Sequence, residues 1–165
     1  MSSRIVNESE YKPLMSEYIR DQKHLERWSI NWIEWDGECL KASAKLNTPS
    51  ISSGEDAYHL SFLSADEIQS QLGIIAVHLR LGLTEKGAEV WLLSNSNNFR
   101  SAIKNIDDVR IDISLDFKKT KSNKIIFTSK SHIWDVSGGE MVMEKISLLA
   151  WQDSWGAPPI SNGIE

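Results

Sequence analysis

The stretch from Ser64 to Leu83 constrains the fold more than any other segment, because no other long run in the chain is so apolar. Its aliphatic residues recur at helical spacing on one face, and further apolar residues widen the stripe most of the way round. Ser64 has a good N-cap side chain, and Ser64-Ala65-Asp66-Glu67 matches a capping box. We therefore expect one long helix that begins at Ser64 and is covered by the rest of the chain.

Composition narrows the class of protein. A chain of 165 residues is expected to form one compact domain with a sizeable core. The net charge of −5 and the lack of basic runs argue against a partner that is nucleic acid or an anionic membrane. The single cysteine, Cys39, excludes an internal disulfide and agrees with a reducing cytoplasm. The sequence shows neither a signal-peptide layout nor an apolar run of membrane-spanning length.

A two-residue periodicity begins at Trp28. Trp28, Ile30 and Trp32 alternate with polar residues, and Asp36-Gly37 then predicts a hairpin turn before a second strand at 40–46. Tryptophans on such a strand pack a core or a subunit interface; the alternative is a stacking platform for a sugar or base. Beyond the long helix, the patterning predicts further strands, at residues 88–96, 109–117, 124–136 and 141–151.

Together these elements predict an α+β protein in which antiparallel strands curl around one central helix, because a single sheet has a single long helix to bury. This arrangement is the hot-dog fold. We expect residues 28–151 to form one hot-dog domain and residues 152–165 to form a C-terminal tail. Residues 1–27 are expected to form an N-terminal extension, in which Pro13 lies in the first turn of a short helix with Leu14, Tyr18 and Leu25 on one stripe.

The residues around the start of the long helix resemble a known family. In 3-hydroxyacyl-carrier-protein dehydratases, a His-Phe-Pro loop precedes a helix that carries Glu-Ala-x-x-Gln. Here His59 matches the histidine, and Glu67 with Gln71 matches the Glu-x-x-x-Gln spacing, although no proline follows His59. The chain length, the N-terminal extension and the helix entry resemble the FcoT-like branch, which comprises long-chain acyl-CoA thioesterases.

This resemblance implies an acyl-CoA or acyl-carrier-protein thioesterase that acts on a fatty or polyketide-type chain. Relatives of the FcoT-like branch add glycine to an enoyl thioester before hydrolysis, so coupled conjugate addition of an amine is an extension of this prediction. One alternative is a dehydratase or hydratase of 3-hydroxyacyl thioesters, and another is a non-catalytic module that binds an acyl ligand. Coenzyme A or phosphopantetheine would belong to the substrate, and no other cofactor is implied. The family also implies a homodimer or higher homo-oligomer.

Thioester chemistry identifies the candidate site residues. Amides at a buried helix start polarise a carbonyl oxygen, so Ser64 is a candidate for substrate binding, and the resemblance implies a substrate-binding role for Gln71. His59 is a candidate to move a proton at the carbon next to the thioester carbonyl. Glu67 is a candidate general base, or only the second member of the capping box. Tyr58 either orients the thioester or packs beside the helix.

Other polar residues receive structural interpretations. We expect Asp66 to interact favourably with the helix dipole and His78 to be a core histidine. Asn95, near the end of the predicted strand 88–96, is interpreted as a turn former. The four histidines of the chain are scattered and predict no metal site, and the sequence has no phosphate loop and no Gly-x-Ser-x-Gly motif.

Overall fold

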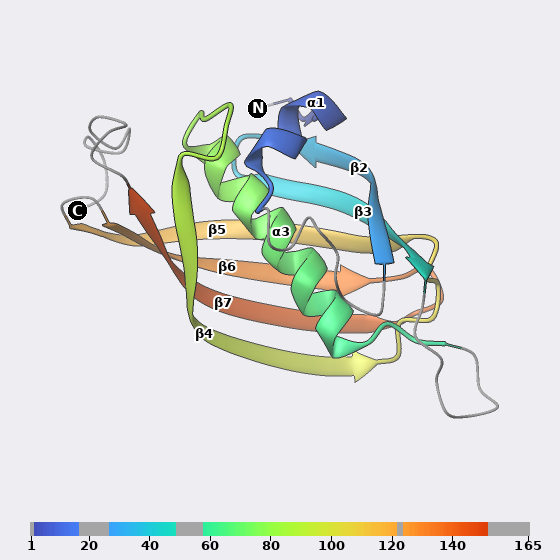
Figure 1. The fold of residues 1–165 in the computed structure, drawn as a ribbon. Coiled ribbons are helices and arrows are strands. Elements are labelled where there is room, and N and C mark those ends of the chain that lie inside the picture. The colour runs from blue at the N-terminus through green and yellow to red at the C-terminus, as the bar shows by residue number, and fades with distance from the viewer. Residues whose placement is uncertain (1, 17–26, 49–57, 122–123, 152–165) are drawn as a thin grey trace.

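The computed structural model describes residues 2–16, 27–48, 58–121 and 124–151, which form an antiparallel sheet curved around one long helix, α3 (Phe62–Arg80) (Figure 1). Two short helical segments precede the main sheet: α1 (Glu8–Tyr11) and the 3₁₀ helix η1 (Lys12–Leu14). The strands follow in chain order: β1 (Arg4–Ile5), β2 (Arg27–Trp35), β3 (Cys39–Thr48), β4 (Ala88–Ser101), β5 (Val109–Lys121), β6 (Lys124–Trp134) and β7 (Glu140–Trp151).

The strand order across the sheet is β1-β2-β3-β5-β6-β7-β4. The chain therefore forms a hairpin, passes through α3, and crosses to the far edge of the sheet, where β4 pairs only with β7 among the described strands. The remaining strands fill the space between β3 and β4 by consecutive antiparallel pairing. This topology is that of the hot-dog fold, which confirms the predicted fold class.

The core lies between α3 and the concave face of the sheet. Ile68, Leu72 and Ile75 on the helix are at most 1% exposed, and Ile111 and Ile113 on β5 are equally buried. Burial of each such side chain contributes about 1.5–3 kcal/mol relative to its exposure to water. The predicted central position of the helix is confirmed.

The long helix begins three residues before the predicted N-cap. Ser61 is the N-cap, with an extended backbone, and its side chain accepts a hydrogen bond from the Ser64 amide. Ser64 lies inside the first turn, so the prediction that it caps the helix with Glu67 as its capping-box partner is wrong. Serines stand at both positions, so the sequence pattern alone does not distinguish the two possible caps.

A β-bulge changes the face on which Trp32 lies. The pairing of β2 with β3 shifts register between Ile30 and Trp32, so the alternation reverses there. Trp28 and Trp35 are buried in the core, whereas Trp32 is half-buried on the other face with the Arg110 guanidinium 5.2 Å from its ring centroid. The prediction that Trp28 and Trp32 share a face is wrong for this reason.

The N-terminal segment contacts the domain. β1 pairs with the end of β2, and Pro13 lies in the first turn of η1, a short 3₁₀ helix. Tyr18 and Leu25, which were predicted to continue this helical stripe, lie outside the described residues, as does the predicted tail at 152–165. The division of the chain at residues 27 and 151 stays a prediction.

Candidate active site at the amino end of the central helix

The first turn of α3 presents backbone amides to a cavity. The Ser61 side chain and carbonyl accept the Ser64 and Ala65 amides, at 3.2 and 3.0 Å. Within the described residues, the Phe62 and Leu63 amides have no acceptor. They lie at the positive end of the helix dipole, where a carbonyl oxygen is polarised by N–H groups.

A cavity of about 300 Å³ opens beside this helix end. His59 is exposed and lines the cavity, as do Phe62 and Phe99, whose rings meet edge to face with centroids 6.1 Å apart. The other lining residues are Leu60, Ser61, Arg100, Ser101, Ala102, Ile103 and Met141. Apolar walls with one imidazole and one guanidinium suit a ligand that has an apolar chain and a polar head.

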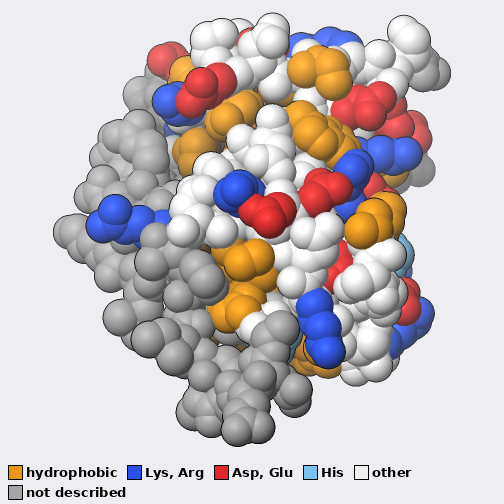
Figure 2. All heavy atoms as spheres, turned by 90° about the vertical axis from the view of Figure 1, so that its right-hand side faces the viewer, with side chains coloured by type: hydrophobic (Ala, Val, Ile, Leu, Met, Phe, Trp, Pro, Cys, Tyr) orange, Lys and Arg blue, Asp and Glu red, His pale blue; other side chains and the backbone are white. Residues whose placement is uncertain are grey.

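Figure 2 views the molecule from the side on which α3 begins, and there hydrophobic side chains lie among lysine, arginine and acidic side chains with neither charge dominant. At the cavity itself, Arg100 is about half exposed and its guanidinium pairs with Glu140 at 2.9 Å. A half-exposed cationic group that borders the cavity can attract an anion, such as a phosphate.

The loop at residues 102–108 forms one wall of this cavity and is fixed to the His59 loop. The Leu60 amide donates to the Ile103 carbonyl at 2.8 Å, which joins the two segments directly. The loop also crosses closely over the β6–β7 turn, because a side chain at Gly139 would place its Cβ 2.4 Å from the Ile103 Cα. Only glycine permits this approach of two backbones.

Asp135 holds the same loop from the other side. It is 3% exposed, and one carboxylate oxygen accepts the amides of Lys104 and Asn105 at 2.6 and 2.7 Å. The other oxygen accepts the Ser137 amide and hydroxyl and the Gly139 amide. Burial alone raises the pKa of Asp135, but these hydrogen bonds outweigh burial and bring the pKa down to about 2. Asp135 is therefore ionised and fixes the cavity wall.

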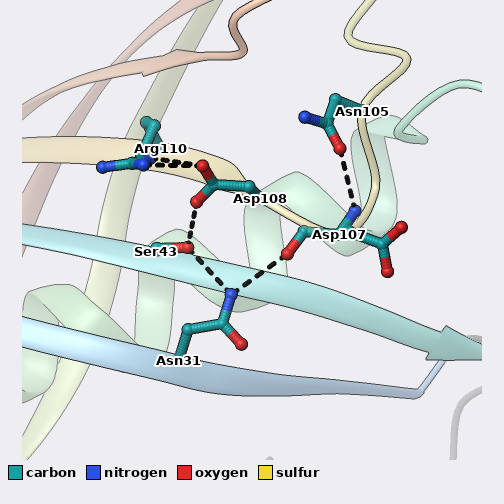
Figure 3. A network of polar contacts seen from close by, with 6 residues as sticks. All are labelled: Asn31, Ser43, Asn105, Asp107, Asp108 and Arg110. Atoms are coloured by element: carbon teal, nitrogen blue, oxygen red, sulfur yellow. Dashed lines mark hydrogen bonds and ion pairs between the residues drawn. The ribbon is translucent and has the colours of Figure 1, made fainter.

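A polar network on the outer face of the sheet anchors the far end of the loop (Figure 3). Asp108 accepts the Ser43 hydroxyl at 2.5 Å and two donors of Arg110 at 2.6 and 2.8 Å. The Asn31 side-chain amide donates to Ser43 and to the Asp107 carbonyl. The hydrogen bonds to Arg110 lower the pKa of Asp108. Both ends of the wall are thus tied to the rigid sheet.

One helical turn deeper, a charged cluster links α3 to β4 and β7. Lys145, whose side chain is 4% exposed, lies 2.8 Å from an Asp66 carboxylate oxygen and also donates to Ser70 at 2.6 Å and to the Asp66 carbonyl at 3.1 Å. Asn95 donates to the same carboxylate oxygen at 2.9 Å. Burial lowers the pKa of Lys145, against the opposite effects of the hydrogen bond and charge of Asp66. Asp66 thus neutralises a buried ammonium.

The sequence-predicted site residues lie on different sides of α3. His59 reaches the cavity, whereas Gln71 is fully buried and exchanges two hydrogen bonds with the Ser16 backbone, at 3.0 and 3.1 Å. Glu67 is half-buried one turn before Gln71, and Tyr58 is half-buried against the core. Ser64 is buried. His59 lines the cavity, whereas Glu67 is not among the lining residues.

Sequence reasoning assigned no chemical role to Asp66, Asn95 and Lys145. Asn95 lies within β4, which continues to Ser101, so the prediction that it forms a turn is wrong. The sequence did contain an indication at Lys145. This lysine occupies an inward-facing position of β7 between Met143 and Ser147, where the alternation of the strand predicts an uncharged side chain. A charge at a core position indicates either a partner or a function.

His78 is buried, as predicted, and its Nδ1 lies 2.7 Å from the Ile74 carbonyl. Burial lowers the pKa of His78. The described part of the chain contains no group of three or more His, Cys, Asp or Glu side chains placed to hold a metal ion. Among its helices, none combines the length and apolar character that crossing a membrane requires.

No protein-family model matches the sequence, and no curated protein matches it. Solved structures do resemble the fold. A hypothetical thioesterase of Streptococcus pneumoniae TIGR4, crystallised with coenzyme A, is 14% identical over 76% of this chain and 88% of its own, with a TM-score of 0.46. A thioesterase of Pseudomonas aeruginosa is 14% identical over 82% and 94% (TM-score 0.48), and AziG of S. sahachiroi is 12% identical over 84% and 98% (TM-score 0.47). The fold assignment rests on the strand order and on the position of α3.

Proposed function

We propose that the protein hydrolyses acyl thioesters at the cavity beside the amino end of α3. The observation that carries this proposal is the meeting of three features in one place: unaccepted helix amides, an imidazole and an apolar cavity of about 300 Å³. Acyl transfer needs donors that stabilise an oxyanion and a group that handles a proton. An apolar chain needs walls such as those of Phe62, Phe99 and Met141.

In this proposal, the thioester carbonyl oxygen points at the Phe62 and Leu63 amides, which stabilise the negative charge that develops on it. His59 takes a proton from a water molecule while the water oxygen attacks the carbonyl carbon. The carbon–sulfur bond then breaks, and the leaving thiolate takes up the proton from the imidazolium. The products are a carboxylic acid and a free thiol.

The other sequence candidates keep secondary roles in the proposal. Glu67 is the second candidate for the base. The N-cap is Ser61 and not Ser64, so a capping box with Ser64 does not explain the presence of Glu67. Tyr58 precedes His59 with ring centroids 6.5 Å apart, so it orients the imidazole by packing. The Gln71 amide is engaged by Ser16, and contact between Gln71 and a substrate would require that pair to open.

The thiol carrier is coenzyme A or the phosphopantetheine arm of a carrier protein. Both carry phosphate, and Arg100 beside the cavity offers a guanidinium that can exchange Glu140 for a phosphate oxygen. The same His59 proton chemistry serves conjugate addition of glycine to an enoyl thioester, or the loss of water from a 3-hydroxyacyl thioester. These reactions, and binding without turnover, are the competing outcomes of the test below.

The test is thiol release from a panel of acyl-CoA thioesters by the purified protein, with and without glycine, combined with mass spectrometry of the acyl product. We expect thiol release that falls about a hundredfold or more in His59→Gln. His132→Gln is the matched control for the loss of a histidine, because His132 stacks on Trp134, contacts Glu140 at 3.0 Å and does not line the cavity. Release unchanged in His59→Gln would exclude this histidine as the base. Water loss, a glycine adduct or tight binding without thiol release would each replace hydrolysis by the corresponding alternative.

We further propose that two copies pair through β4. Within the described chain, the outer edge of this strand has no partner, and Trp91, Leu92 and Leu93 are 53–61% exposed on it. A long apolar edge strand pairs with another strand unless something blocks it. Light scattering after size-exclusion chromatography should give a dimer mass that Leu93→Lys reduces to a monomer. Val136→Lys, at an exposed apolar residue outside β4, is the control. A wild-type monomer at micromolar concentration would contradict the proposal.

A further inference from the structure

A second cavity, of about 70 Å³, lies under the middle of α3. Gln69, Ser70, Gly73 and Ile74 line it from the helix. The lining residues of the sheet are Val90 and Leu92 of β4, Phe127 and Ser129 of β6, and Lys145 and Ser147 of β7. A space of this size admits a few water-sized groups or the end of a chain. It is separate from the cavity at His59, with which it shares no lining residue.

Gln69 brings an unused polar group to this cavity. Its side chain is 1% exposed, and its amide nitrogen donates to the Ser129 and Ser131 hydroxyls at 3.2 and 3.0 Å. Its side-chain oxygen is fully enclosed and has no hydrogen-bond partner among the residues that the structure describes. A buried amide oxygen without a partner costs about 1–3 kcal/mol. Such a group, beside a cavity, indicates that a ligand completes its hydrogen bonding.

Gly73 keeps the cavity open. It lies in the interior of a 19-residue helix, where glycine costs about 0.5–1 kcal/mol relative to alanine. Packing does not demand this glycine, since a Cβ would meet nothing closer than the Gln69 amide nitrogen at 3.8 Å, an ordinary contact. Alanine would fit at this position and would stabilise the helix. The glycine instead leaves space beside the helix that a ligand can occupy.

The charges around the cavity select a neutral ligand group. Asp66 and Ser70 engage the Lys145 ammonium, so the lysine is neutralised by the chain itself. A carboxylate on the ligand would face the unpartnered Gln69 oxygen, and an ammonium would face Lys145. A hydroxyl carries no charge and both donates and accepts, so it pairs with the free end of the Gln69 amide and with the neighbouring serines.

Both cavities lie along α3. Phe62, Asp66 and Ser70 recur every fourth residue and therefore lie on one face of α3. Phe62 borders the first cavity and Ser70 borders the second. The axial separation is about 12 Å at 1.5 Å rise per residue. An acyl chain with its thioester at the helix start therefore reaches the second cavity only with a distant carbon, and on this face it passes the Asp66–Lys145 ion pair, which lies between Phe62 and Ser70.

We propose that the second cavity binds a hydroxyl group near the far end of the acyl chain, so that the preferred substrate is an ω-hydroxylated acyl thioester of medium length. This inference rests on the proposed thioesterase function, because it uses the first cavity to place the carbonyl. The Gln69 oxygen accepts a hydrogen bond from the hydroxyl, and Gly73 provides the room for the terminal carbon.

The test compares kcat/KM for ω-hydroxydecanoyl-CoA and decanoyl-CoA. We expect the wild-type protein to prefer the hydroxylated chain about tenfold, which corresponds to one net hydrogen bond. Gly73→Ala and Gln69→Leu should each bring this ratio close to one. Thr128→Val, a buried polar-to-apolar change on β6 that lines neither cavity, should keep it. Thermal denaturation of each variant verifies that it is folded, and Gly73→Ala should melt above wild type.

Calorimetric binding of ω-hydroxydecanoate and decanoate separates this inference from the proposed function. If neither thioester is hydrolysed but the hydroxylated acid still binds more tightly, and Gly73→Ala removes the difference, the function fails and the cavity assignment stands. Hydrolysis without preference for the hydroxyl would overturn the cavity assignment and leave the function standing. Equal binding of the two acids, without hydrolysis of either thioester, would overturn both.

Discussion

Gln69 and Gln71 are both buried in the same helix, two residues apart, yet their surroundings differ. Gln71 faces the N-terminal segment and uses both ends of its amide on the Ser16 backbone. Gln69 faces β6 and a cavity, and only its nitrogen is used within the described chain. The side chains diverge because two residues along a helix rotate the direction by about 200°. One glutamine therefore joins two segments, and the other leaves a polar group available.

The two glutamines show that the same type of side chain can be buried for a structural reason or for a functional one. A buried polar group whose hydrogen bonds are all made within the chain holds segments together, and its loss costs stability. A buried polar group that keeps one bond unmade beside a cavity contributes little to stability and is available to a ligand. The predictions that follow test this distinction, from the largest expected effect to the smallest.

Gln71→Leu should cause the largest loss. It leaves the N–H and C=O of Ser16, a residue that is 1% exposed, without partners. Each unpaired backbone group costs about 1–3 kcal/mol, so we expect the free energy of unfolding to fall by about 3 kcal/mol. Urea denaturation monitored by tryptophan fluorescence measures this change. A loss below about 1 kcal/mol would show that the hydrogen bonds of Gln71 contribute no more to stability than those of Gln69.

Asp135 provides a second fully engaged group, on the wall of the first cavity. Its pKa of about 2 lies below the ordinary value of 3.8, so its contribution is fully present above about pH 4 and is lost as the pH falls through 2. We expect Asp135→Asn to lower the free energy of unfolding by about 2 kcal/mol at pH 7. The difference from wild type should shrink towards zero near pH 2. A difference that does not change between pH 7 and 2 would contradict this account.

A similar comparison can be made between two serines at the start of α3, only one of which is the N-cap. Ser61 accepts the Ser64 amide, whereas the Ser64 side chain lies inside the first turn. Ser61→Ala should lower the free energy of unfolding by about 1 kcal/mol, the usual cost of a lost N-cap. Ser64→Ala is the matched variant and should cost less in the same denaturation experiment. The reverse order would restore Ser64 as the cap.

Gln69→Leu should have the smallest effect on stability. It removes two hydrogen bonds to serine hydroxyls but also removes an unpartnered oxygen from the interior. We expect these changes to nearly cancel and the free energy of unfolding to stay within about 1 kcal/mol of wild type. A loss as large as that of Gln71→Leu would show that both glutamines are structural, and would weaken the assignment of the second cavity.

Local patterns predicted the fold, the strand periodicity and the buried position of α3 correctly, because apolar periodicity reports which side of an element faces the core. Local rules failed where two choices were chemically alike. Ser61 and Ser64 both fit an N-cap, and a bulge of one residue moved Trp32 to the other face of the sheet. Asn95 suggested a turn, whereas pairing with β7 extends β4 beyond it.

The sequence by itself determined that one long helix is wrapped by an antiparallel sheet, because the predicted strands form a single sheet and the chain has one long apolar helix for it to bury. It also located His59 beside the start of the helix. Only the tertiary structure decided which polar residues of the helix are engaged and which are available. Gln71 meets Ser16 from 55 residues away, and Asp66 meets Lys145 from β7. The physical reason is that helical spacing fixes the direction of a side chain, whereas its partner depends on segments that are distant in the sequence.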